Sequence, residues 1–192
     1  MRGRPRTAPA CEWAARHLSR HVMMNGMATL LLVLALVSTG LYAGFYLIFL
    51  TGIMPALARL SDEQFVAAMR RINEKVPRAT FVLVFLGSAG FPAAALFVPV
   101  DGRTATERWL VVAALVCAVA GHLVTVAGNV PLNNALAASE TSATPESSAA
   151  SAPSVSDREA RAAFESRWNA FHLVRTVLAL AAFVLLVCAA TV

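Results

Sequence analysis

One apolar stretch of the sequence carries four polar side chains that repeat with a helical period. They are separated by three, four and four residues: His122, Thr125, Asn129 and Asn133. This spacing places them on one face of a helix. Polar groups deep in an apolar helix are costly, and they usually face a bundle interior, a proton path or a ligand cavity. We therefore treat them as candidate site residues; the alternative is that they only cap a helix end or tie helices together.

The last apolar stretch has a similar pattern around an arginine. Trp168, His172 and Arg175 share one helical face, and Asn169 and Thr176 lie beside them. An arginine one to two turns inside a membrane span costs about 2.5 kcal/mol or more unless it is paired or reaches the interface. Arg175 is therefore the residue for which a function is hardest to dismiss, whereas Trp168 at a helix start is also typical of an interfacial anchor.

Other motifs for chemistry are absent from the sequence. It has no glycine-rich nucleotide loop, no HExxH and no GxSxG. His122 and His172 make a weak metal site, because no third acidic or thiolate ligand stands near them. The cysteines are far apart and form no CxxC pair, so they indicate packing and not a disulfide framework: Cys11, Cys117 and Cys188. We predict no metal site.

The composition indicates which elements must position these residues. The 192 residues are 58% hydrophobic and only 14% charged, whereas about a quarter of the residues in a soluble domain are charged. Four stretches reach the ~20 apolar residues that a spanning helix needs: about 27–54, 80–100, 109–130 and 168–192. The sequence thus predicts an all-α bundle of four transmembrane helices and argues against a water-soluble enzyme.

The segments outside the spans divide the chain. Residues 1–26 are expected to form a basic N-terminal tail, and 27–192 a single membrane domain. Pro131 is expected to end the third span, because it lacks a backbone donor. The Ser-, Ala-, Thr- and Pro-rich stretch 138–157 has no periodicity and predicts a flexible loop. Residues 158–167 either form a weak amphipathic segment or extend the fourth span outward.

Residues 60–76 have the pattern of a short amphipathic helix between the first two spans. Ser61 followed by Gln64 predicts a capped helix start. Apolar residues then repeat at helical spacing: Phe65, Ala68, Met69 and Ile72. We expect this helix to lie at the membrane interface.

The connectivity of four spans brings the candidates together. The end of the first span, the end of the third and the start of the fourth must lie on one side of the membrane. A polar pocket is expected there, beneath the amphipathic helix. The residues expected to meet in it are Asn73, Asn129, Asn133, His172 and Arg175. Tyr42 and Tyr46 of the first span either line the pocket or only pack between helices.

The net charge of +5 comes from short basic flanks around the apolar runs, not from one basic face. We therefore expect the lipid bilayer as a partner and no nucleic acid. Counted from Met1, the two sides of the membrane carry seven and eight Lys and Arg, which does not set an orientation. A start at Met23, Met24 or Met27 would favour cytoplasmic first and third loops, which is the orientation we expect, in a bacterial-type plasma membrane. A homo-oligomer stays an alternative to a monomer.

In combination, four motifs resemble the anthrone oxygenase family, a group of small four-helix membrane proteins. The first two are Met54-Pro55-Ala56-Leu57 and the stretch 65–73 of the amphipathic helix. The third is Asn129-Val130-Pro131-Leu132-Asn133, and the fourth is Trp168-Asn169 followed by His172, Arg175 and Thr176. The resemblance covers about residues 28–190.

The resemblance implies oxidation of an anthrone-like polycyclic phenol, of the kind found in polyketide pathways, with dioxygen as co-substrate and no known metal, flavin or nicotinamide. His172 would then be the general base. Arg175, with Asn129 and Asn133, would stabilise the enolate and the peroxide. Trp168 would stack on the flat hydrophobic substrate. The remaining residues expected to bind substrate are Asn73, Tyr42, Tyr46, His122 and Asn169. The alternative is a non-enzymatic scaffold subunit or a small transporter whose polar cluster only packs helices.

Overall fold

The computed structural model describes residues 9–100, 102–141 and 156–192. Within these ranges every regular element is helical, and four helical stretches are long and apolar enough to cross a membrane. They are Met23–Leu57, Ala79–Phe97, Ala105–Ser139 and Asp157–Ala189. The chain is therefore a multi-pass membrane protein, and the predicted all-α fold with four membrane helices is confirmed.

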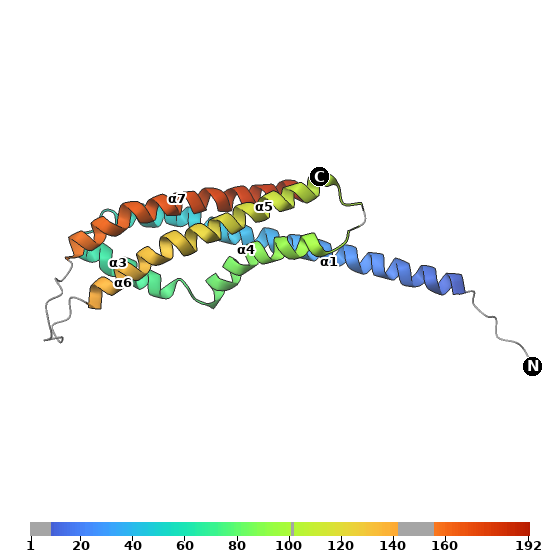
Figure 1. Cartoon of the computed structure of the whole chain (residues 1–192), viewed down its shortest axis with the longest axis horizontal. Helices are drawn as coiled ribbons and strands as arrows, with labels where there is room; N and C mark the ends of the chain where they lie inside the picture. The colour runs from blue at the N-terminus through green and yellow to red at the C-terminus, as the bar shows by residue number, and fades with distance from the viewer. Residues whose placement is uncertain (1–8, 101, 142–155) are drawn as a thin grey trace, which may run out of the picture.

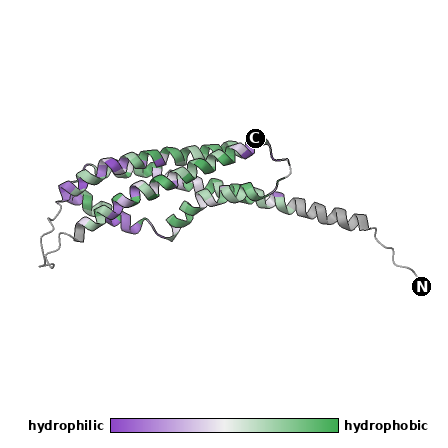
Figure 2. Cartoon of the chain, viewed as in Figure 1, coloured by the Kyte–Doolittle hydropathy of each residue, from purple (hydrophilic) through white to green (hydrophobic). Residues whose placement is uncertain are grey.

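Four long helices lie side by side in an elongated bundle (Figure 1). They are α1 (Pro9–Ile48), α4 (Ala79–Phe97), α5 (Ala105–Val124) and α7 (Asp157–Ala189). Helix α7 packs along α5 and α1, while α4 packs along α1 and α5. Apolar residues cover the middle of the bundle, and hydrophilic residues gather at the end where α3 and α6 lie (Figure 2). This polar end is where the site is found.

A wide π-helical turn interrupts each of the spans that contain α1 and α5. The turn η1 (Phe49–Ile53) separates α1 from α2 (Met54–Leu57), and η2 (Thr125–Asn129) separates α5 from α6 (Val130–Thr141). In both cases a proline follows two residues after the turn, Pro55 or Pro131. The prediction that Pro131 ends the third span is wrong. In a regular helix the proline ring would clash with the carbonyl four residues earlier and leave it without a donor. The extra residue of the π turn changes the position of that carbonyl, so the helix continues through the proline.

Helix α3 (Asp62–Lys75) covers the polar end of the bundle. The predicted capping box between Ser61 and Gln64 is present. The apolar face of α3 is buried against α6 and α7, with Phe65 and Met69 fully inaccessible. The Arg70 guanidinium of α3 also donates to the Leu136 carbonyl of α6 at 3.0 Å and to the Ser139 hydroxyl at 2.7 Å. The amphipathic helix is therefore fixed to the bundle.

Arg161 fixes the connection between α2 and α3 to α7. Its guanidinium donates to the carbonyls of Ala58 at 3.0 Å and Leu60 at 2.9 Å. It also forms ion pairs with Asp62 at 3.1 Å and with Glu165 at 2.7 Å. These contacts satisfy carbonyls at the end of α2 that have no helical partner. Together with the contacts of Arg70 to α6, they fix α3 over the polar end of the bundle.

Several predicted boundaries differ from the structure. Helix α1 already begins at Pro9, and α5 begins at Ala105. Residues 158–167 belong to α7, so of the two alternatives the structure has the one in which they extend the fourth span outward. Helix α6 continues to Thr141, into the predicted loop 138–157. The remainder of that predicted loop, 142–155, lies outside the described residues.

Candidate functional site

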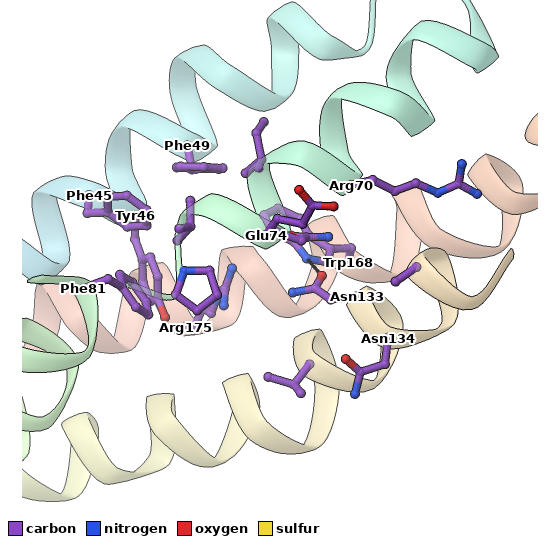
Figure 3. Close-up of a pocket in the computed structure, with 16 residues that line it drawn as sticks. Phe45, Tyr46, Phe49, Arg70, Glu74, Phe81, Asn133, Asn134, Trp168 and Arg175 are labelled. Carbon is purple, nitrogen blue, oxygen red and sulfur yellow. Dashed lines mark hydrogen bonds between the residues drawn. The ribbon is translucent and has the colours of Figure 1, made fainter. Parts of the chain in front are cut away.

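A cavity of about 360 Å³ lies between α3 and the end of the bundle. This volume is within the range of about 300–1,000 Å³ that is usual for small-molecule sites. The cavity has aliphatic residues, aromatic rings, amides, two arginines and one carboxylate in its wall, and Figure 3 draws these side chains. Its aromatic, polar and charged residues are Phe45, Tyr46, Phe49, Arg70, Asn73, Glu74, Phe81, Asn133, Asn134, Trp168 and Arg175.

Arg175 of α7 places a buried cation at the cavity. The residue is only 7% exposed. Its guanidinium carbon lies 4.4 Å from the centre of the Tyr46 ring and 5.1 Å from that of Trp168, which are cation–π distances. Among the described residues, no carboxylate is within ion-pair distance of Arg175. A buried cation without a counter-charge favours an anionic group in the adjoining cavity.

His172 fixes the position of this arginine. Its Nδ1 accepts a hydrogen bond from Arg175 Nε at 3.0 Å, and its Nε2 pairs with the Tyr46 carbonyl at 3.1 Å. A guanidinium only donates and a carbonyl only accepts, so the ring is neutral with its hydrogen on Nε2. The ring also stacks on Trp168 at 4.8 Å.

Both nitrogens of His172 are therefore occupied in this geometry. The side chain is fully buried and does not line the cavity. A general-base role for His172 stays a prediction, and it requires that the Arg175 contact breaks before the ring can accept a proton. The structure itself shows a residue that positions Arg175.

Side-chain amides of η2 and α6 hold the backbone and the ring of Trp168. Trp168 Nε1 donates to Asn133 Oδ1 at 2.9 Å, and Asn129 Nδ2 donates to the Trp168 carbonyl at 3.2 Å. Asn73 is different, because its Nδ2 is buried and has no hydrogen-bond partner among the described residues. Asn73 also lines the cavity. Its amide is thus a donor available to a ligand oxygen.

A chain of hydroxyl groups runs behind the cavity. The Thr125 hydroxyl donates to the Gly121 carbonyl at 3.0 Å, so its oxygen accepts from the Tyr46 hydroxyl at 3.2 Å. The Tyr46 oxygen in turn accepts from the Tyr42 hydroxyl. Tyr46 therefore contributes its ring to the cavity wall, while its hydroxyl is committed to the bundle interior.

The ten residues predicted for the site fall into two groups. Five line the cavity: Tyr46, Asn73, Asn133, Trp168 and Arg175. The other five do not: Tyr42, His122, Asn129, Asn169 and His172. His122 hydrogen-bonds Ser88 of α4 at 3.1 Å and packs on Phe85. The extra residue in η2 rotates the residues that follow it by about 100° around the helix axis, which is the rotation of one residue. The four polar residues predicted to share one face of a regular helix therefore do not all share one face.

Sequence reasoning missed much of the cavity wall. The rings of Phe45, Phe49 and Phe81 line it, but a phenylalanine in an apolar span gives no sign of whether it faces lipid or a ligand. Glu74 also lines it. As one charge on the polar face of an amphipathic helix, it was indistinguishable from a solvated residue. The sequence offered one sign that Glu74 belongs to the cavity, namely that it directly follows Asn73, which was predicted to line it.

The donor set of the cavity suits an organic anion more than a metal ion. Guanidinium and amide N–H groups bind oxyanions, and aromatic rings bind flat apolar surfaces. Among the described residues, no three His, Cys, Asp or Glu side chains lie close enough together to hold a metal.

Residues 69–185 match the family described as Anthrone oxygenase. This stretch is more than half of the chain and runs from α3 to α7, so it contains Asn73, Trp168 and Arg175. Comparison with curated proteins gives no match, and neither does comparison with solved structures.

Proposed function

Because this chain belongs to the anthrone oxygenase family, we propose that it is a membrane-embedded oxygenase that converts an anthrone-like polycyclic phenol to the anthraquinone. Dioxygen is the co-substrate, no metal or organic cofactor takes part, and the protein resides in a bacterial-type plasma membrane. One observation carries the proposal: the guanidinium of Arg175 faces an aromatic cavity without a carboxylate partner among the described residues.

The cavity offers complementary contacts for such a substrate. The rings of Phe45, Phe49 and Phe81 line the cavity and offer apolar surface to a flat polycyclic molecule. The carbonyl oxygen of the substrate, which becomes the enolate oxygen, can accept hydrogen bonds from Arg175 and from the unpaired Asn73 amide. His172 holds Arg175 in place, and a preorganised donor of this kind stabilises charge as it develops during a reaction.

The reaction needs few groups from the protein. An anthrone carries an acidic CH₂ group across the central ring from its carbonyl, and loss of one proton gives an enolate. The enolate passes one electron to dioxygen, and the two radicals combine into a peroxide anion at that carbon, which is then protonated. Removal of the second proton from the same carbon breaks the O–O bond, so that a carbonyl forms and hydroxide leaves and becomes water. One anthrone and one dioxygen give one anthraquinone and one water.

Oxygen consumption by the purified protein in lipid nanodiscs tests this function. We expect EDTA-treated protein to accelerate oxygen uptake with a hydroxylated anthrone above the uncatalysed rate, with one dioxygen consumed for each anthraquinone formed. Nanodiscs without protein give the background. A rate equal to that background would contradict the proposal and would favour the non-enzymatic alternative, in which the polar cluster serves helix packing.

A further inference from the structure

The reaction requires a proton acceptor, and the geometry points to Glu74 of α3 as the group that removes the protons from the substrate carbon. This inference rests on the proposed function and assigns a further catalytic residue to the same cavity. It also replaces His172 in that role, which the sequence alone had favoured.

The other basic groups near the cavity are already engaged. The lone pair of His172 Nδ1 accepts from Arg175 Nε at 3.0 Å. The Tyr46 hydroxyl donates to Thr125 and accepts from Tyr42. Arginine side chains have no lone pair to offer. Among the described residues that line the cavity, Glu74 is the only carboxylate.

Glu74 is available both to the cavity and to water. Its only ion pair among the described residues is with Arg71, at 3.4 Å. The Arg71 side chain is 77% exposed and that of Glu74 is 52% exposed. A solvated pair of this kind contributes little and is readily broken. Glu74 can therefore turn to a ligand in the cavity, and a proton that it carries can exchange with water at the interface.

The substrate has two reacting ends, and the cavity offers a separate residue for each. In an anthrone the acidic carbon and the carbonyl oxygen are on opposite sides of the central ring. Glu74 and Arg175 reach the cavity from two different helices, α3 and α7 (Figure 3), so a bound substrate can present its acidic carbon to one and its carbonyl oxygen to the other. A carboxylate is a weak base for a carbon acid, so the step depends on Arg175 and Asn73 stabilising the enolate oxygen.

The carboxylate is regenerated within one turnover. Glu74 takes the first proton from the CH₂ group and returns it to the peroxide anion. It then takes the second proton from the same carbon as the O–O bond breaks, and the departing hydroxide receives that proton and becomes water. No further oxidant or reductant is needed.

Deuterium exchange separates proton removal from oxygen chemistry. The protein in nanodiscs is incubated with the anthrone in D₂O without oxygen, and loss of the CH₂ signal is followed by NMR. We expect the wild type to accelerate exchange and Glu74→Gln to lose this acceleration by about 10²-fold or more, which is the usual contribution of a general base. Glu63→Gln is the matched control, since Glu63 is an exposed carboxylate on the same helix outside the cavity.

Binding of an anthraquinone, followed by tryptophan fluorescence, shows whether the Glu74→Gln cavity is intact. Lost exchange with unchanged binding would support the inference. Unchanged exchange and oxygen uptake in Glu74→Gln would overturn it while the proposed function stands. A wild-type protein that accelerates neither exchange nor oxygen uptake would overturn both.

Discussion

Replacing Arg175 by leucine is expected to lower anthrone turnover by about 10²-fold or more, because removal of one oxyanion donor typically has an effect of this size. The guanidinium is buried, faces the cavity and has no carboxylate partner in the described part of the chain. Turnover is measured as oxygen uptake in nanodiscs. Arg167→Leu is the control, since Arg167 is an exposed arginine on the same helix.

The same substitution separates a functional role of Arg175 from a structural one. Arg175→Leu removes the cost of a buried charge, but it also leaves His172 Nδ1 without its donor, which costs about 1–3 kcal/mol. Because these two effects oppose each other, we expect Arg175→Leu to lose turnover while its unfolding temperature, followed by tryptophan fluorescence in detergent, changes little. If Arg175 only ties helices together, the substitution should lower the unfolding temperature and leave turnover by the folded protein unchanged, and that result would count against the proposed site.

Substitutions of His172 are expected to show that it positions Arg175. His172→Leu removes the acceptor for Arg175 Nε and leaves both that donor and the Tyr46 carbonyl without a partner. A buried unsatisfied group costs about 1–3 kcal/mol of stability, so Arg175 should leave its present position, and turnover should fall by about 10- to 100-fold, part of the effect of removing the arginine. His172→Asn can place Oδ1 near the former Nδ1, so it should retain more activity than His172→Leu.

The pH dependence of turnover distinguishes the two roles of His172. If it positions Arg175, the activity that remains in His172→Asn should keep the shape of the wild-type pH profile. If it is the general base, His172→Asn should be as inactive as His172→Leu, and the limb of the profile that reports the base should change. The second outcome would restore the role predicted from the sequence and exclude Glu74 as the base.

The sequence was informative where burial and periodicity act over many residues. The lengths of the apolar stretches predicted four spans, and the Ser61–Gln64 capping box with its apolar repeat predicted α3. The cost of an intramembrane charge singled out Arg175. These signals depend on composition and local spacing, so they can be read without knowledge of the tertiary contacts.

Features set by local departures from regular helix geometry could not be predicted in this way. Pro131 was expected to end a helix, but η2 allows the helix to pass through it. The same π turn separates His122 from Asn133, although both fit one face of a regular helix. His172 was chosen as a base because of its residue type, whereas its role depends on which atoms face its two nitrogens. Glu74 could be assigned to the cavity only once the position of α3 was known.

Binding of an anthraquinone next to Trp168 tests the central claim most directly. A protein with Trp13→Phe and Trp109→Phe keeps Trp168 as its only tryptophan. We predict saturable quenching of its fluorescence by a dihydroxyanthraquinone in nanodiscs. Adding Arg175→Leu should raise the Kd by about 10-fold or more, since a hydrogen bond to a charged group contributes about 1.5–3 kcal/mol. Quenching that does not saturate, or a Kd unaffected by Arg175→Leu, would contradict an aromatic anion site at this end of the bundle.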